Sequence, residues 1–168
     1  METAESKIAR VFHLTGDNWM KHTNPWSVAT RYSVLPIIVV SFWSRIWIGW
    51  LCVIPAALSL TWMFVNPLVF KKPRSTKNWA SLSVLGERVW QNRKNIAVPE
   101  RHLIMPQICN LISSLGMLLA IAAIIWLLPW PAVLGVALAY LGKSWYLDRM
   151  VWLFEDMKHV PEYAAWLY

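Results

Sequence analysis

The stretch YLGKSWYLDRMVWLFEDMKH, from Tyr140 to His159, decides the fold. At about 100° per residue in a helix, one stripe of this stretch carries Trp145, Asp148, Trp152, Glu155 and His159. The segment that leads into it, residues 131–142, is apolar and uncharged. This order predicts a helix whose first part lies in the membrane and whose second part extends out of the lipid and carries a stripe of Trp, carboxylate and His.

The composition of the 168-residue chain favours a membrane protein. Hydrophobic residues make up 57% of the chain and charged residues 15%, which is too apolar for an ordinary soluble domain. The 13 Trp residues are typical of aromatic belts, because an indole has an apolar body and one N–H donor. The polar first thirty residues contain no apolar core of a signal peptide, so we expect the N-terminus to stay in the cytosol.

Four segments are long and apolar enough to cross a hydrocarbon core of about 30 Å, at about 1.5 Å per helical residue. They are predicted over about residues 25–44, 46–65, 107–128 and 132–157. Asn24 and Pro25 suit the cap and first turn of the first span, and Pro36 predicts a kink in it. A tight turn at Arg45 joins the first two spans, and Asn66-Pro67 is expected to end the second.

Small residues recur three and four positions apart in the third and fourth spans. They are Gly116, Ala120, Ala123, Gly135, Ala139 and Gly142. Faces of this kind let two backbones approach closely, so we expect these two helices to pack together along them.

Two short amphipathic segments, about residues 4–14 and 81–93, are predicted outside the spans. The apolar side of the second is expected on the membrane surface, and it consists of Leu82, Leu85, Val89 and Trp90. Outside the spans, Lys and Arg concentrate before the first span, over residues 71–101, and after the fourth. The positive-inside rule therefore places both termini in the cytosol. The predicted fold class is an all-α integral membrane protein, a four-transmembrane-helix bundle in a prokaryotic cytoplasmic (inner) membrane.

Charged and aromatic residues near the inner ends of the spans form the candidate ligand-binding cluster. Its members are Trp26, Arg31, Glu87, Lys143, Trp145, Asp148, Arg149, Trp152 and Glu155. One interpretation is that the cations only extend to the headgroups as anchors. The other is that Arg31, Lys143 and Arg149 face inward and, partly neutralised by the carboxylates, form a cytosol-facing pocket for an anionic headgroup or substrate.

Other chemistries are less well supported by the sequence. Glu155 and His159 are four residues apart and could grip a metal ion, with His13, His22 and His102 able to reach the same face. A di-metal bundle would need paired motifs inside the helices, so we predict no metal site. The spans over 46–65 and 107–128 contain no His for haem ligation, and we predict no cofactor. The loop cations lie beside the membrane and favour anionic lipid over nucleic acid.

Four strings of the sequence carry a resemblance to a known family. They are HTNPWS at 22–27, WSRIWIGW at 43–50, VLGERVWQNR at 84–93 and WYLDRMVWLFEDM at 145–157. In wording and order they resemble a family of small, Trp-rich polytopic membrane proteins of bacteria and archaea, catalogued as a domain of unknown function. The resemblance covers nearly the whole chain and implies a membrane protein without an assigned activity, so no catalytic residue follows from it.

Two functional hypotheses remain open at this point. The first is a non-enzymatic membrane protein that binds lipid, or a partner membrane subunit or second copy of itself, through the cluster. The alternative is a membrane enzyme or carrier that acts on an anionic, lipid-like substrate in the same cluster. In both, the expected surroundings are a lipid bilayer with anionic lipids, and nucleic acid is not an expected partner.

Overall fold

The computed structural model describes residues 17–168, which form helices and contain no strand. The predicted all-helical class is therefore confirmed for this part of the chain. The amphipathic segment expected over residues 4–14 lies outside the described residues. The elements are α2 (Asp17–His22), α3 (Pro25–Tyr32), α4 (Val34–Trp43), α5 (Arg45–Ile48), η1 (Gly49–Cys52), α6 (Val53–Val69), α7 (Trp79–Gln91), η2 (Glu100–His102), α8 (Met105–Trp126), α9 (Pro129–Met157) and α10 (Pro161–Ala164).

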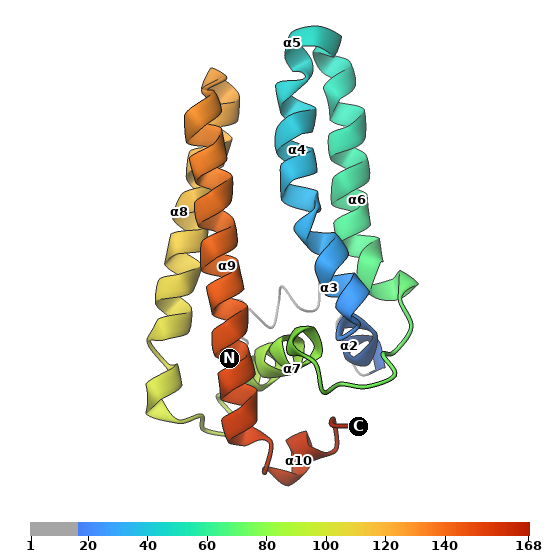
Figure 1. Cartoon of the computed structure of the whole chain (residues 1–168), viewed down its shortest axis with the longest axis vertical. Coiled ribbons are helices and arrows are strands. Elements are labelled where there is room, and N and C mark those ends of the chain that lie inside the picture. The colour runs from blue at the N-terminus through green and yellow to red at the C-terminus, as the bar shows by residue number, and fades with distance from the viewer. Residues whose placement is uncertain (1–16) are drawn as a thin grey trace.

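Two long helical hairpins stand side by side in the structure (Figure 1). In the first, α3 and α4 run against α6, and in the second α8 runs against α9. Helix α7 lies across the lower end of Figure 1 between the hairpins, near α2 and α10, and it packs mainly against α9. The hairpins are therefore linked through α7 at one end of the molecule. At the other end, Arg45 in the turn of the first hairpin donates hydrogen bonds to the carbonyl oxygens of Ile124 and Ile125 in α8.

The first hairpin begins with the cap that the sequence predicts. The side chain of Asn24 accepts a hydrogen bond from the backbone N–H of Trp26 at 2.9 Å, and Pro25 is the first helical residue. The helix is interrupted between Tyr32 and Val34, one turn before Pro36. Because proline has no N–H to donate to the carbonyl four residues earlier, this break is the predicted effect of Pro36 on the helix.

The second helix of this hairpin differs from its prediction at both ends. It begins at Val53 rather than at 46, because Gly49 adopts a positive φ of 57° and the turn occupies α5 and η1. It also continues through Asn66-Pro67 to Val69 instead of ending there.

Asn66 explains why the helix does not end at the expected place. Its side chain is fully buried, accepts a hydrogen bond from Ser27 Oγ at 2.6 Å and donates one to Thr30 Oγ1 at 2.8 Å. A residue that reads as a helix breaker is therefore a polar contact between α6 and α3. Pro67 lies close to the helix end, and its missing N–H removes a single backbone bond.

The second hairpin packs along the small residues that the sequence identifies. A methyl group added at Gly116 would lie 2.7 Å from the carbonyl oxygen of Gly135, and one at Gly135 would lie 2.5 Å from the backbone nitrogen of Ala120. Gly142 has the same relation to Ser113. Because such separations are shorter than ordinary van der Waals contact, only glycine allows α8 and α9 to approach this closely. The predicted pairing is confirmed.

Helix α7 is not a surface helix, which corrects the expectation for residues 81–93. Leu85, Val89 and Trp90 are buried inside the protein, in the same apolar core as Met150 and Phe154 of α9. A helix has the same amphipathic pattern whether its apolar side meets lipid or protein. Here that side meets α9.

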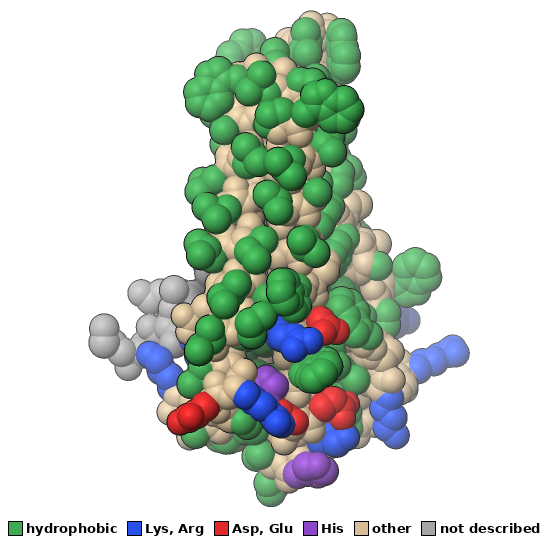
Figure 2. Space-filling model, turned by 60° about the vertical axis from the view of Figure 1, so that its left-hand side comes forward, with side chains coloured by type: hydrophobic (Ala, Val, Ile, Leu, Met, Phe, Trp, Pro, Cys, Tyr) green, Lys and Arg blue, Asp and Glu red, His purple; other side chains and the backbone are tan. Residues whose placement is uncertain are grey.

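The surface of the two hairpins away from α7 is apolar. Two helical stretches, Pro25–Val69 and Glu100–Trp126, are long and apolar enough to cross a membrane. Only 11% and 28% of the residues in their apolar windows are buried inside the protein, so these stretches are not the covered core helices of a soluble domain. Figure 2 shows hydrophobic side chains over the tall part of the molecule and the charged side chains gathered at its lower end.

Candidate functional site

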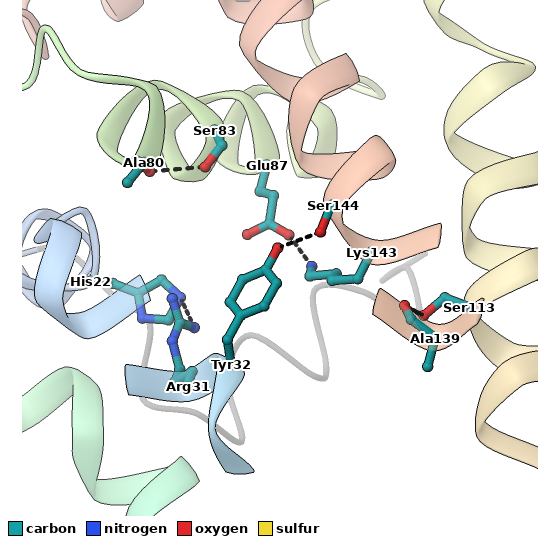
Figure 3. A network of polar contacts seen from close by, with 10 residues as sticks. All are labelled: His22, Arg31, Tyr32, Ala80, Ser83, Glu87, Ser113, Ala139, Lys143 and Ser144. Atoms are coloured by element: carbon teal, nitrogen blue, oxygen red, sulfur yellow. Dashed lines mark hydrogen bonds and ion pairs between the residues drawn. The ribbon is translucent and has the colours of Figure 1, made fainter. Parts of the chain in front are cut away.

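A small pocket lies where α3, α7 and α9 meet, and we call it the polar pocket. Its volume is about 130 Å³, and it is lined by Val28, Arg31, Tyr32, Val84, Glu87, Tyr140, Lys143 and Leu147. Figure 3 shows Tyr32, Glu87 and Lys143 converging from the three helices, and Arg31 turned toward His22. Three of the residues in the predicted cluster, Arg31, Glu87 and Lys143, are thus brought together.

Lys143 and Glu87 form the ion pair of the polar pocket. Lys143 Nζ lies 2.7 Å from Glu87 Oε1, and the Lys143 and Glu87 side chains are 45% and 17% exposed. The ammonium group also lies 4.7 Å from the centre of the Tyr146 ring, a distance at which an aromatic face attracts a cation. The pair therefore joins α7 to α9 through a contact that is partly shielded from solvent.

Arg31 is held by uncharged acceptors. Its Nε donates to the carbonyl oxygen of Ser27 at 3.1 Å, and one of its terminal nitrogens lies 2.6 Å from His22 Nε2. No carboxylate within residues 17–168 forms an ion pair with it. Two cations and one carboxylate line the polar pocket, so its walls carry an excess of positive charge.

His22 stays neutral in this arrangement. Burial holds the pKa of its imidazole well below the usual 6.5, and the nearby charges of Arg31 and Lys143 act in the same direction. A neutral ring can accept the hydrogen bond from Arg31 at Nε2, which leaves the proton on Nδ1. Nδ1 is buried and has no hydrogen-bond partner in the described part of the chain.

Two tyrosines, one from each hairpin, lie at the upper edge of the polar pocket. The rings of Tyr32 and Tyr140 stack with their centres 5.4 Å apart, and Tyr32 Oη lies 3.2 Å from Ser144 Oγ. The Tyr140 hydroxyl donates to the carbonyl oxygen of Tyr32. That carbonyl is the one that Pro36 leaves without a helical donor, so α9 supplies the hydrogen bond that α4 lacks.

A larger, apolar cavity lies between the hairpins beyond the tyrosines, and we call it the inter-hairpin cleft. Its volume is about 460 Å³, and its lining consists of Pro36, Val39, Val40, Trp43, Pro129, Ala132, Val133, Val136 and Ala137. It separates α4 from α9 and carries no polar side chain on its walls.

The other residues of the predicted cluster do not reach the polar pocket. Trp26 is 71% exposed and Trp145 is 40% exposed. Glu155 pairs with Lys158 on its own helix at 2.6 Å, at the protein surface.

Asp148 and Arg149 pair with each other at 2.9 Å, with side chains 42% and 26% exposed. Arg149 also lies over the ring of Trp152 at 4.5 Å. Ion pairs this exposed contribute about 0 to 1 kcal/mol to stability. The predicted cluster is thus divided between the polar pocket and this more exposed group on α9.

The more exposed group borders a second groove, of about 400 Å³, between the start of α8 and α9. Arg101, His102 and Asp156 line it together with Arg149 and Trp152. His102 Nε2 lies 2.5 Å from Asp156 Oδ2, which also accepts from Arg101. Like the polar pocket, this groove is lined by two cations and one carboxylate, but here both cations have carboxylate partners, Arg101 in Asp156 and Arg149 in Asp148.

Sequence reasoning misses two polar residues that line the pocket, Tyr32 and Tyr140, and the contact of His22 with Arg31. The one available signal is Pro36, because a proline in a span implies a free carbonyl at Tyr32 that needs a donor. The donor comes from 108 residues further along the chain, and spacing gives no indication of it. No group of three or more His, Cys, Asp or Glu side chains in residues 17–168 is placed to hold a metal ion.

The fold and pocket define an all-helical protein with membrane-length apolar stretches and a cationic pocket at their charged end. The chain belongs to a family of unknown function, DUF6653, whose model matches residues 3–167. No curated protein and no solved structure matches the chain.

Proposed function

We propose that the protein is a four-span integral membrane protein of a prokaryotic cytoplasmic membrane that binds an anionic lipid at the polar pocket. The observation that carries the proposal is the position of this pocket. Its excess positive charge lies at the foot of an apolar column whose surface is largely uncovered by protein. Anionic headgroups are the abundant ligands at the cytosolic face of a membrane, which is the face nearer to this pocket in the proposed orientation.

The tryptophans of α9 support a fourth span in addition to those of the first hairpin and α8. Trp130 is 80% exposed near one end of the helix, and Trp152 is 57% exposed near the other. They are 22 residues apart, which is about 33 Å at 1.5 Å per residue, close to the thickness of a hydrocarbon core. Exposed indoles at both boundaries are the arrangement expected of aromatic belts.

The orientation follows from the charges, which gather at the α7 end (Figure 2). The positive-inside rule places this end in the cytosol. Reporter fusions after residues 78 and 168 are expected to report a cytosolic location, and a reporter inserted at Trp130 an external one. An external signal at residue 78 contradicts the topology.

Lipid binding is tested by native mass spectrometry of the gently solubilised protein. We expect a lipid adduct in the wild type that is reduced in Lys143→Met and in Arg31→Met. The control is Lys94→Met, because Lys94 is an exposed cation beyond the end of α7. Equal retention in all three variants contradicts the proposal, and a protein adduct or a dimer without lipid would favour a partner subunit instead.

A further inference from the structure

We propose that the polar pocket and the inter-hairpin cleft are the two ends of one site for a long-chain carboxylate, a fatty acid. The carboxylate would lie beside Lys143 and Arg31, and the alkyl chain between α4 and α9. The inference rests on the proposed function and adds the chemical class of the lipid and the path of its chain.

The two cavities follow one another along the same faces of the same helices. On α9, Ala137 of the cleft is three residues from Tyr140 and six from Lys143 of the pocket. Across from it, Pro36 of the cleft is one helical turn from Tyr32. On α9, residues three and four apart share a helix face, so the apolar lining gives way to the polar lining within about one turn. On the other side, the break between α3 and α4 separates the two linings.

The stacked tyrosines mark the junction. Their rings present aromatic carbon, and both hydroxyls are already engaged, one with Ser144 and one with the Tyr32 carbonyl. The stacked rings bridge the two hairpins between the cavities, so an alkyl chain would lie along their outer edge. Lying there requires no polar group from the chain, whereas a headgroup would lose its water beside the rings without gaining a partner. The junction thus separates the two halves of an amphiphile.

The size and charge of the polar pocket favour a small headgroup with one negative charge. The pocket volume of about 130 Å³ is small for a ligand site. A carboxylate is the smallest anionic headgroup of a membrane lipid and needs less of this space than the glycerol phosphodiester of a two-chain phospholipid. The walls supply one uncompensated positive charge from Arg31 and Lys143 against Glu87, which matches the single negative charge of a carboxylate.

The cleft selects the chain. Its 460 Å³ falls within the range of small-molecule sites, about 300 to 1,000 Å³, and valine, alanine and proline leave this space open. A chain that moves from bilayer to cleft gains little hydrophobic free energy, because lipid tails are as apolar as these side chains. We therefore expect the charge to set the affinity and the cleft to set the position of the chain.

The test is photo-crosslinking of the full-length, detergent-solubilised protein with palmitate analogues that carry a diazirine near the carboxylate or near the chain end. The chain-end probe is expected to label residues 36–43 and 129–137, and the other probe the turns around Tyr32 and Tyr140. Unlabelled palmitate should compete. Its methyl ester should compete about tenfold less well or worse, because a hydrogen bond to a charged group is lost.

A variant that fills the cleft provides the matched comparison. Val136→Trp is expected to remove chain-end labelling, and Leu134→Trp, on an exposed position of the same helix that does not line the cleft, is expected to preserve it. Chain-end labelling of the outer surfaces alone, or equal competition by the methyl ester in the wild type, overturns the inference. If the native adduct is a phospholipid that still depends on Lys143, the proposed function stands and the fatty acid is wrong. If no adduct depends on Lys143, both fail.

Discussion

Gly86→Ala is the substitution for which local and tertiary effects disagree most clearly. Gly86 lies in the middle of α7, where alanine favours the helix by about 1 kcal/mol relative to glycine. A methyl group there, however, would lie 2.5 Å from the carbonyl carbon of Met150 in α9, and closer still to its oxygen. Ordinary contacts between carbon and a carbonyl oxygen are about 3.3 to 3.6 Å, so α7 must move away by about 1 Å or more.

The displacement is costly because two backbones meet at this point. Extra volume in a packed core costs about 1 to 3 kcal/mol, and a backbone atom cannot rotate aside as a side chain can. The movement also separates Leu85 and Val89 from the core of α9 and lengthens the 2.7 Å contact between Glu87 and Lys143. We therefore expect packing to outweigh propensity and the variant to be destabilised by about 2 kcal/mol.

The measurement is thermal unfolding of the detergent-solubilised protein. For a chain of this size, 2 kcal/mol corresponds to a decrease in Tm of about 4 to 8 °C. Ser83→Ala on the same helix is the control, because the Ser83 hydroxyl bonds only to its own helix, at Ala80, and its loss costs less than about 1 kcal/mol. A Tm for Gly86→Ala equal to or above that of the wild type would refute the close packing of the α7 backbone against α9.

Three further predictions concern contacts that the structure shows and the sequence does not. Tyr140→Phe leaves the Tyr32 carbonyl without a donor and should lower the free energy of unfolding by about 1 to 3 kcal/mol. Adding Pro36→Ala restores a backbone N–H for this carbonyl, so the double variant should recover part of the lost Tm in thermal unfolding. An unchanged Tm in Tyr140→Phe contradicts the hydrogen bond. Arg45→Ala removes two 2.8 Å hydrogen bonds to the last carbonyls of α8, so amide exchange near that helix end should accelerate, with exchange in α7 as the internal control. Burial holds the pKa of His22 in the folded protein below 6.5, so the neutral ring contributes its full stabilisation above pH 6.5. Below pH 6.5 the free energy of unfolding should decrease by up to about 1.4 kcal/mol per pH unit, until the pH reaches the folded-state pKa. His22→Asn should reduce this slope in urea or thermal unfolding between about pH 6.5 and 5, and an identical slope in both proteins means that His22 does not titrate in this way.

The features that the sequence predicts correctly depend on residues close together in the chain. The cap at Asn24, the break before Pro36 and the glycine face of α8 and α9 follow from spacing within one element or between adjacent elements. In each case the physical constraint, an unpaired N–H or a missing Cβ, is visible in the residue type itself.

The features that sequence reasoning misses require a partner from a distant segment. The apolar side of α7 predicts a surface that needs covering, but membrane and protein satisfy that need equally well. Asn66 reads as a breaker because its partners on α3 lie 36 and 39 residues earlier. The predicted cluster also contains residues that do not line the polar pocket. Trp26 and Glu155 are of residue types common in binding sites, but both lie at the protein surface.

The burial of α7 and the charge of α9 have a common explanation. If Trp130 marks the outer boundary, Lys143 lies about 20 Å further along the helix at 1.5 Å per residue, inside a core of about 30 Å. A cation at that depth is costly unless it is paired or extends to the headgroups. Gly86 allows α7 to approach the α9 backbone closely, and the next residue, Glu87, thereby reaches Lys143. One carboxylate pairs with one of the two cations, and the remaining positive charge of Arg31 is the one that the proposed lipid would neutralise.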